Sequence, residues 1–354
     1  MQKLGRWMAK NPTPILLSML FVLFTSSAFV ISSLITTVES EQQATMKVEA
    51  LGALTSYVSD AGRDIDRGGQ RLQMLTEGLA AELQTLLLSA PPSSNSSSSS
   101  NSSRLTGSFR HASVHLSKQG DAVAMLAQQK KLAPLHDRFR TIFLRALTSK
   151  TFPQSLEEQL LFLSSEKSVL QSAYLGLESG LELRYPGLDT LSDHEDPRTQ
   201  RWYQDSAQQS QLNPQFGLPY TNKDEDGSTV VPCNAPVRDA QGQLLGVVGT
   251  NIRLDLLTDV IQMDQPRERI GRKHARPPLQ GWRRSQLFSK DHHLIASAMP
   301  STLAAQPPNE DPRVREFISA EKSNGVLFST DRITVIRLLN AIGWYLVVEV
   351  EREA

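Results

Sequence analysis

The sequence predicts an α+β protein with antiparallel sheets, built as a long N-terminal helix followed by two units of short strands and helices. Three patterns predict this class. An uncharged apolar segment covers residues 15–35, and apolar residues then recur at heptad spacing through residue 86. From residue 172 onward, short strand-like runs alternate with helical segments and turn residues. Antiparallel strands with interleaved helices are typical of α+β domains.

The composition excludes several classes of partner and chemistry. Lys and Arg number 37 and Asp and Glu number 37, so the net charge is zero and no nucleic-acid partner is expected. Cys233 is the single cysteine, which excludes an internal disulfide and a cysteine-based zinc site. The sequence has no Ser-His-Asp elbow, His-Glu-x-x-His motif, glycine-rich phosphate loop or paired carboxylates. We therefore expect no enzyme, no catalytic residue, no cofactor and no metal site.

Residues 15–35 predict a transmembrane anchor. Roughly 20 apolar residues, at about 1.5 Å rise each, cross a hydrocarbon core about 30 Å thick. Charged residues flank the segment: Lys3, Arg6 and Lys10 before it, Glu39 and Glu41 after it. The positive-inside rule then makes residues 1–14 a cytoplasmic tail of a single-pass inner (cytoplasmic) membrane protein, with the bulk of the chain periplasmic or extracellular. A cleaved signal peptide is the alternative, but its apolar core normally spans about 7 to 15 residues.

Residues 36–90 are expected to form one long stalk helix. Two apolar series run along it: Leu51, Val58, Ile65, Leu72, Leu79 and Leu86, and Leu54, Ala61, Gly68, Leu75 and Glu82. Their 3–4 alternation marks a narrow stripe on one face. The stripe predicts either a helix packed along its own domain or the stalk of a homodimer that carries signal. Residues 91–120 follow as a Ser- and Asn-rich flexible loop, which has too little apolar surface to order.

Residues 121–264 are expected to form the first sheet unit with its preceding helices. Helical patterns cover residues 121–149 and 155–171, and another helix follows the cap formed by Asp196 and Pro197. Strand patterns cover residues 173–178, 181–185, 230–237 and 244–252, and residues 254–263 favour a helix. Residues 265–281, rich in Arg and Pro, are expected to form a connector.

A second sheet unit is expected over residues 282–354. Its strands are predicted at residues 286–289, 294–298, 325–329, 334–339 and 344–350. The sequence ends soon after the last of these strands. Signalling output would therefore require a separate or missing cytoplasmic signalling domain.

Four stretches in the first unit resemble a known family when taken together. They are residues 173–186, 196–203, 219–220 and 235–249. Their order is similar to that in the membrane-distal lobe of double Cache sensors, which serve chemoreceptors, histidine kinases and diguanylate cyclases. The resemblance implies two PAS-like Cache lobes beside the long helix. The membrane-distal lobe would be residues 121–264, and the membrane-proximal lobe would be residues 282–354.

The resemblance also implies a pocket for a small molecule in the distal lobe. Amino-acid-binding members carry Arg-x-Trp-Tyr on the pocket helix. Trp202 and Tyr203 match the last two positions of this motif, and Tyr220 matches an aromatic residue further along the chain. Gln200 stands at the arginine position, and Asn251 stands at a strand-end aspartate position. Both replacements form hydrogen bonds without carrying charge, which disfavours a standard amino acid. A neutral polar ligand, or an acid lacking an amine, fits these residues better.

Alternatives remain open for single residues of this pocket. Arg201 or Arg198 would substitute for the missing carboxylate clamp. Arg198, which follows Asp196 and Pro197, would otherwise tie its loop to the sheet. Trp202 and Tyr203 would otherwise be ordinary core aromatics beside the sheet.

Two functions follow from this reading of the sequence. The first is a membrane-anchored extracytoplasmic sensor, the input domain of a signal transduction receptor, which binds a small polar or carboxylate ligand in the distal lobe. The second is a ligand-free structural or adaptor Cache protein that acts through a membrane partner. The replaced charges at Gln200 and Asn251 favour the second function, and the retained aromatic residues favour the first.

Overall fold

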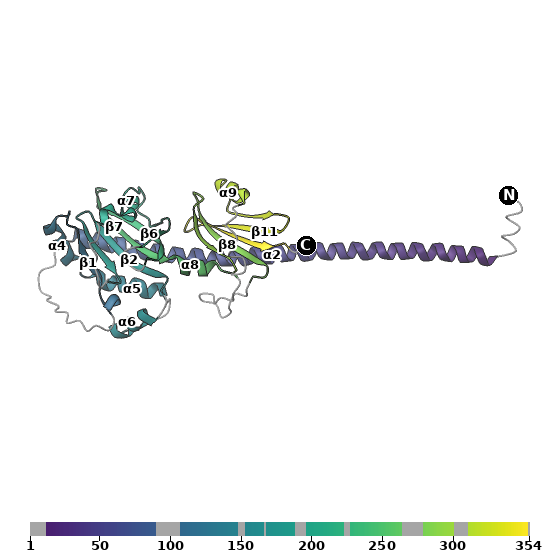
Figure 1. The fold of residues 1–354 in the computed structure, drawn as a ribbon, viewed down its shortest axis with the longest axis horizontal. Helices are drawn as coiled ribbons and strands as arrows, with labels where there is room; N and C mark the ends of the chain where they lie inside the picture. Colours follow the sequence, from purple (N-terminus) through teal and green to yellow (C-terminus); the bar gives the residue numbers. More distant parts are fainter. Residues whose placement is uncertain are drawn as a thin grey trace. The chain divides into compact units, whose positions relative to one another are not determined.

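The chain has an α+β fold with two antiparallel sheets, seen in a computed structural model (Figure 1). The structure describes residues 12–89, 107–147, 153–165, 168–187, 196–222, 227–263, 279–300 and 311–352. The Ser-rich stretch at 91–103 lies wholly outside these residues, and so does most of the expected connector at 265–281. The chain divides into two compact units, Met1–Val58 and Ser59–Ala354.

The long helix expected from the heptad pattern is present as α2 (Pro12–Leu88). Within the second unit, its buried positions are Ala61, Gly62, Ile65, Gly69, Leu72, Leu75, Thr76, Leu79 and Leu83. The predicted stripe had Gly68 and Glu82 in place of Gly69 and Leu83. A straight helix drifts by about 20° per heptad relative to a 3.5-residue repeat, which moves the buried face by one position. From residue 59 onward, α2 therefore packs along its own domain.

The predicted anchor, residues 15–35, falls in the N-terminal part of α2. The structure describes the backbone of this part, but not its side chains. Over the described part of the chain, none of the helices has the length and apolar character of a membrane span.

The first lobe, residues 107–263, is built around a seven-stranded sheet with the order β1-β3-β2-β7-β6-β4, and β5 also pairs with β6. The strands are β1 (Ser113–Leu116), β2 (Leu170–Leu177), β3 (Leu181–Tyr185), β4 (Gln215–Phe216), β5 (Tyr220–Thr221), β6 (Thr229–Arg238) and β7 (Leu244–Arg253). The helices are α3 (Gly107–Arg110), α4 (Ala122–Lys131), α5 (Leu135–Leu147), α6 (Leu156–Ser165), the 3₁₀ helix η1 (Pro197–Thr199), α7 (Arg201–Ala207) and α8 (Leu254–Ile261).

Three expectations for this lobe were wrong in detail. The flexible loop expected over residues 91–120 contains β1, an edge strand that pairs with β3. The single helix expected over residues 121–149 is two helices, because Pro134 lacks an N–H group and disfavours helical geometry in the residue before it. The helix expected over residues 155–171 gives way to β2, which begins at Leu170.

The two faces of the first sheet differ in chemistry. One face is apolar and packs against α2 and α5. Tyr185 contacts Phe139 and Phe143 there, and the Thr76 hydroxyl of α2 lies 3.1 Å from that of Thr250. The opposite face carries polar residues, among them Asn234 and Asn251. Helix α7 lies beside this face (Figure 1).

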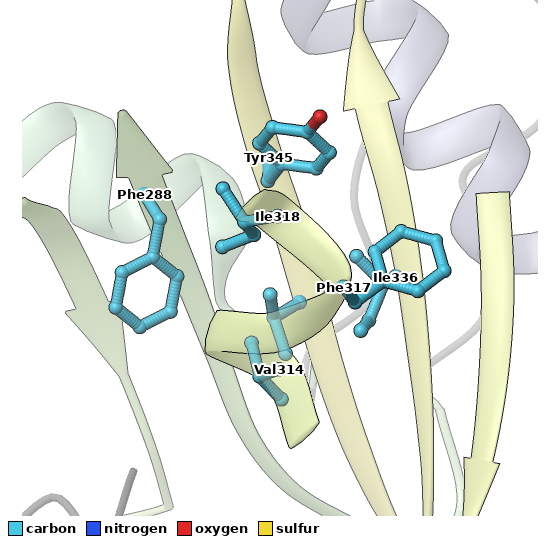
Figure 2. Close-up of a cluster of buried hydrophobic side chains, with 7 residues drawn as sticks. Phe288, Val314, Phe317, Ile318, Ile336 and Tyr345 are labelled. Carbon is cyan, nitrogen blue, oxygen red and sulfur yellow. The ribbon is translucent and has the colours of Figure 1, made fainter. Parts of the chain in front are cut away.

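The second lobe, residues 279–352, is a five-stranded sheet with the order β10-β11-β12-β8-β9. Its elements are β8 (Trp282–Ser289), β9 (Leu294–Ala298), α9 (Pro312–Ser319), β10 (Asn324–Phe328), β11 (Arg332–Leu339) and β12 (Trp344–Glu351). The five predicted strands are thus confirmed, whereas α9 was missed. The α9 side chains Val314, Phe317 and Ile318 pack on one sheet face (Figure 2).

Helix α2 holds the second lobe through specific backbone and side-chain contacts. The Asp66 carboxylate accepts a hydrogen bond from the Ala341 N–H at 2.9 Å, and Arg337 donates to Ser59 Oγ at 2.9 Å. A Cβ atom added at Gly69 would lie 2.1 Å from Ile342 Cγ2. The glycine therefore allows close contact between the helix and this lobe.

Candidate functional site

The candidate site is the polar face of the first sheet. Strand pairing places Tyr174 of β2 between Arg184 of β3 and Gly249 of β7, and places Ser172 opposite Asn251. Because side chains alternate along each strand, these residues share one face. The same alternation sends the apolar residues of β2 to the face that packs against α2 and α5.

A hydrogen-bonded network occupies the centre of this face. The Tyr174 hydroxyl donates to Asn234 Oδ1 at 2.8 Å and lies 3.1 Å from Asn251 Oδ1. The Asn251 amide nitrogen lies 3.1 Å from Ser172 Oγ and 3.0 Å from the Tyr220 hydroxyl. Burial is the main factor that raises the pKa of Tyr174, and nearby Tyr220 adds to it, so the phenol stays neutral.

A buried ion pair extends the network toward β3. Arg184 Nη2 lies 2.9 Å from Glu182 Oε1, and side-chain exposure is 10% for the arginine and 8% for the glutamate. The Arg184 guanidinium also lies over the Tyr174 ring, 5.7 Å from its centroid. The face thus offers one fixed positive charge and one fixed negative charge within a largely dry environment.

Aromatic side chains from α7 cover part of this face. The Trp202 ring meets Tyr174 edge-on, with 4.7 Å between centroids, and it meets Tyr203 at 5.7 Å. A Cβ atom at Gly176 would lie 2.8 Å from Trp202 Cη2, so glycine allows the helix to approach β2. Tyr203 donates to Glu178 Oε1 at 3.0 Å, and burial is the main cause of its raised pKa.

Arg198 holds the entry to α7 in place. Its guanidinium pairs with Asp196 at 2.5 Å and donates to the Glu178 carbonyl at 3.1 Å, next to the β2–β3 turn. Asp196 also caps η1 by accepting from the Arg198 N–H. These contacts match the structural role proposed for Arg198, which ties its loop to the sheet.

The other predicted site residues differ in their placement. Trp202 and Tyr203 adjoin Tyr174, and Tyr220 and Asn251 join the same network. Arg201 is exposed and pairs with Asp205 one helical turn later. Gln200 is half-buried at the start of α7 and makes no capping hydrogen bond through its side chain.

Sequence reasoning missed five polar residues of the face: Ser172, Tyr174, Glu182, Arg184 and Asn234. A signal for two of them was present in residues 181–185, where the charged residues alternate with Leu181, Leu183 and Tyr185. Such alternation predicts a strand with one polar face. It does not reveal that this polar face is buried, because burial depends on α7, which arrives from elsewhere in the sequence.

The fold is similar to that of solved ligand-binding domains of bacterial chemoreceptors, which are double Cache sensor domains. In particular, the ligand-binding domain of the Campylobacter jejuni chemoreceptor Tlp3 in complex with L-valine superimposes with a TM-score of 0.50 at 12% identity, over 87% of this chain and 95% of that one. The same sensory domain with isoleucine bound gives the same values. The amino acid chemoreceptor PctC of Pseudomonas aeruginosa PAO1, in complex with GABA, gives 0.45 at 17% identity over 84% and 98%.

No family model and no curated protein matches the sequence. At this level of identity the likeness shows the fold alone. The expected α+β architecture of two antiparallel sheet lobes beside a long helix is therefore confirmed, whereas the ligand must be argued from the residues themselves.

Proposed function

We propose that this protein is a membrane-anchored extracytoplasmic sensor, the input domain of a signal transduction receptor. The ligand is held between α7 and the polar face of the first sheet. One observation carries the proposal: a buried polar network with an ion pair lies beneath the aromatic side chains of α7. Such a network contributes less to stability than well-packed apolar residues of similar volume. Its presence in a sensor fold therefore favours a role in recognition.

The charges of the face indicate the chemistry of the ligand. Arg184 supplies the guanidinium that the pocket helix lacks, so a ligand carboxylate would compete with Glu182 for it. Asn251 and Tyr220 form hydrogen bonds without selecting a charge. Trp202 provides an apolar surface for the ligand's stem. We therefore propose a small polar or carboxylate ligand, and the amino acids bound by Tlp3 are of similar size.

The proposal includes the membrane topology. The uncharged segment at residues 15–35 would anchor the chain in the cytoplasmic membrane, with residues 1–14 inside and both lobes outside. The chain would act as a homodimer through its long helix and transmit ligand binding to a cytoplasmic signalling domain. Membrane fractionation and sedimentation of the full-length protein test the anchor and the dimer, and a monomer free of the membrane contradicts both.

A thermal-shift screen of the full-length protein tests the ligand site. Amino acids, other carboxylates, amines and nucleosides form the library. A ligand at about 100 times its dissociation constant should stabilise the protein by about 2.7 kcal/mol. Asn251→Leu should abolish the shift because it removes the centre of the network. Asp205→Asn should preserve the shift, since Asp205 is exposed and pairs with Arg201 on the surface.

A second function is favoured by one specific observation. Among the residues that the structure describes, the side-chain hydrogen bonds of Asn251 and of the Tyr174 hydroxyl are with other residues of the same network. A network that satisfies itself suits a ligand-free adaptor acting through a membrane partner. If no compound in the screen shifts the melting temperature, while Asn251→Leu lowers it, the adaptor function replaces the sensor.

A further inference from the structure

The start of strand β1 is fastened to helix α5 through an imidazole. The Ala112 backbone N–H donates to His136 Nδ1 at 3.0 Å, and Ala112 is buried. A ring nitrogen that accepts a hydrogen bond carries no proton, so the proton of the neutral ring is on Nε2. Protonation of Nδ1 would set two N–H groups against each other. The hydrogen bond therefore exists only while His136 is neutral.

Three features of the surroundings keep this imidazole neutral. His136 lies in the first turn of α5, where the partial positive charge of a helix N-terminus disfavours a cation. Burial is the main factor that lowers its pKa below the usual value of about 6.5, and the nearby His111 imidazole lowers it further. Asp137 acts in the opposite direction, but its carboxylate pairs with Arg140. The closed hydrogen bond and the charged ring are thus incompatible on grounds of both geometry and charge.

The segment before β1 joins two elements of the first lobe. The Phe109 carbonyl accepts from the Tyr185 hydroxyl at 2.7 Å, and the His111 carbonyl accepts from the Gly187 N–H at 2.9 Å. These contacts tie the segment to the end of β3, whereas the His136 hydrogen bond ties it to α5. Strand β1 lies at the edge of the sheet. An edge strand is held by a neighbouring strand on one side alone, so the ties at its ends matter more.

Strand β1 also reaches the candidate site at two points. Ser113 pairs with Arg184, the arginine of the buried ion pair. Just after the strand, the Ser117 hydroxyl donates to Asp196 at 2.7 Å, and Asp196 caps η1, which leads into α7. A displacement of β1 would therefore affect both the charged residues of the polar face and the helix that covers them.

We propose that His136 and the backbone of Ala112 form an acid-sensitive latch. While the imidazole is neutral, the latch holds the start of β1 on α5. Protonation turns the acceptor nitrogen into a donor and releases the strand, which loosens the contacts of β1 with Arg184 and Asp196. Histidine is the side chain whose charge ordinarily changes between about pH 5 and 8. Acid would thus act on this lobe in addition to any ligand, through the chain's own side chains.

Hydrogen exchange of the full-length protein at pH 7 and pH 5 tests the latch. The open form binds a proton with an ordinary histidine pKa and the closed form with a lower one, so the open population rises as the pH falls below about 6.5. After correction for the intrinsic exchange rate at each pH, the amides of residues 112–117 should open roughly 5- to 25-fold more often at pH 5.

Two matched variants isolate the imidazole. His136→Asn places an amide oxygen close to the position of Nδ1 but cannot titrate, so it should abolish the difference between the two pH values. His293→Asn is the same change at an exposed turn of the second lobe, and it should retain the difference. Each variant is first melted to establish that it is folded.

An NMR titration of the His136 imidazole in the wild-type protein provides a readout that needs no variant. Its midpoint should lie below about pH 6.5. A midpoint at or above that value would overturn the proposal, as would equal wild-type exchange at pH 7 and pH 5, or a difference that persists in folded His136→Asn. These measurements use no ligand, so failure of the latch and failure of the proposed sensor function are separate results.

Discussion

At the residue scale, Asp196 joins two segments of the first lobe, its own loop and the end of β1. It accepts from the Ser117 hydroxyl at 2.7 Å and from the Arg198 backbone N–H at 2.9 Å, and it pairs with the Arg198 guanidinium. Hydrogen bonds from Arg198 hold the pKa of this carboxyl well below its usual range, although burial opposes them. The carboxylate is thus more acidic in the folded protein than in the unfolded chain, where its pKa is about 3.9.

Replacing Asp196 should therefore reduce stability in a pH-dependent way. A lowered folded-state pKa gives stability that is present above about pH 4 and is lost as the pH falls toward the folded pKa. Asp196→Asn should lower the unfolding free energy by roughly 1–3 kcal/mol at pH 7 and by less at pH 3. Urea unfolding at both pH values measures the difference. Equal losses at the two values would contradict the role of the ionised carboxylate.

Cys233 provides a second prediction at this scale. The thiol is fully buried, and burial raises its pKa to about 12. At pH 8 only about one thiol in ten thousand would be ionised, compared with about a quarter for an exposed cysteine. A thiol-reactive dye should therefore label the denatured protein at once and the native protein only as it unfolds. Prompt labelling of the native protein would show that β6 is accessible.

The sequence allowed part of the site to be predicted. The resemblance pointed to Trp202, Tyr203, Tyr220 and Asn251, and the structure places all of them in or beside one network. Arg201 was proposed as a carboxylate clamp, yet it lies on the exposed side of α7. Arg184 was missed because its role depends on the register of β2 and β3, which brings it beside Tyr174. Local sequence patterns do not determine such cross-strand neighbours.

At the element scale, the long helix shows both the power and the limit of periodicity. Heptad spacing predicted a helix over residues 36–90, and α2 includes that segment and ends at Leu88, since a sustained pattern over many turns is a strong signal. It misplaced the buried face at Gly68 and Glu82, because 3.6 residues per turn and a 3.5-residue repeat diverge along a straight helix. The short strands β4 and β5, with two residues each, gave no pattern of their own.

Two adjacent glycines of α2 give a matched prediction. A Cβ atom at Gly68 would meet nothing within 4 Å, so Gly68→Ala should stabilise the protein by about 0.5–1 kcal/mol through helix propensity. A Cβ atom at Gly69 would lie 2.1 Å from the branched side chain of Ile342. Gly69→Ala should therefore destabilise by about 1–2 kcal/mol in spite of the same propensity gain. Chemical denaturation compares the two variants, and equal effects would refute the close packing.

At the scale of the whole molecule, residues 59–88 of α2 contact both sheets. Thr76 reaches Thr250 of the first lobe, and Asp66 accepts from the backbone of Ala341 in the second. The lobes also meet directly, because the rings of Phe216 and Trp344 lie 5.1 Å apart. Residues from Ser59 onward form one compact unit. These shared contacts predict that the lobes unfold together.

Native-state hydrogen exchange tests this coupling. The slowest amides of β7 and β12 should report opening free energies within about 1 kcal/mol of each other. Asp66→Ala should lower both by a similar amount, since removing one contact of α2 weakens a single cooperative unit. If the variant affects only β12, the lobes unfold separately.

The two lobes repeat one local device: an Asp-Pro-Arg triplet in which the aspartate begins a helix and the arginine returns to hold it, at Asp196 and again at Asp311. In both places the arginine also donates to a backbone carbonyl, that of Glu178 or that of Phe328. The chain thus contains two copies of the same Asp–Arg interaction in different surroundings. Making the same substitution at each copy would show how much of an interaction's strength comes from its surroundings rather than from the residues themselves.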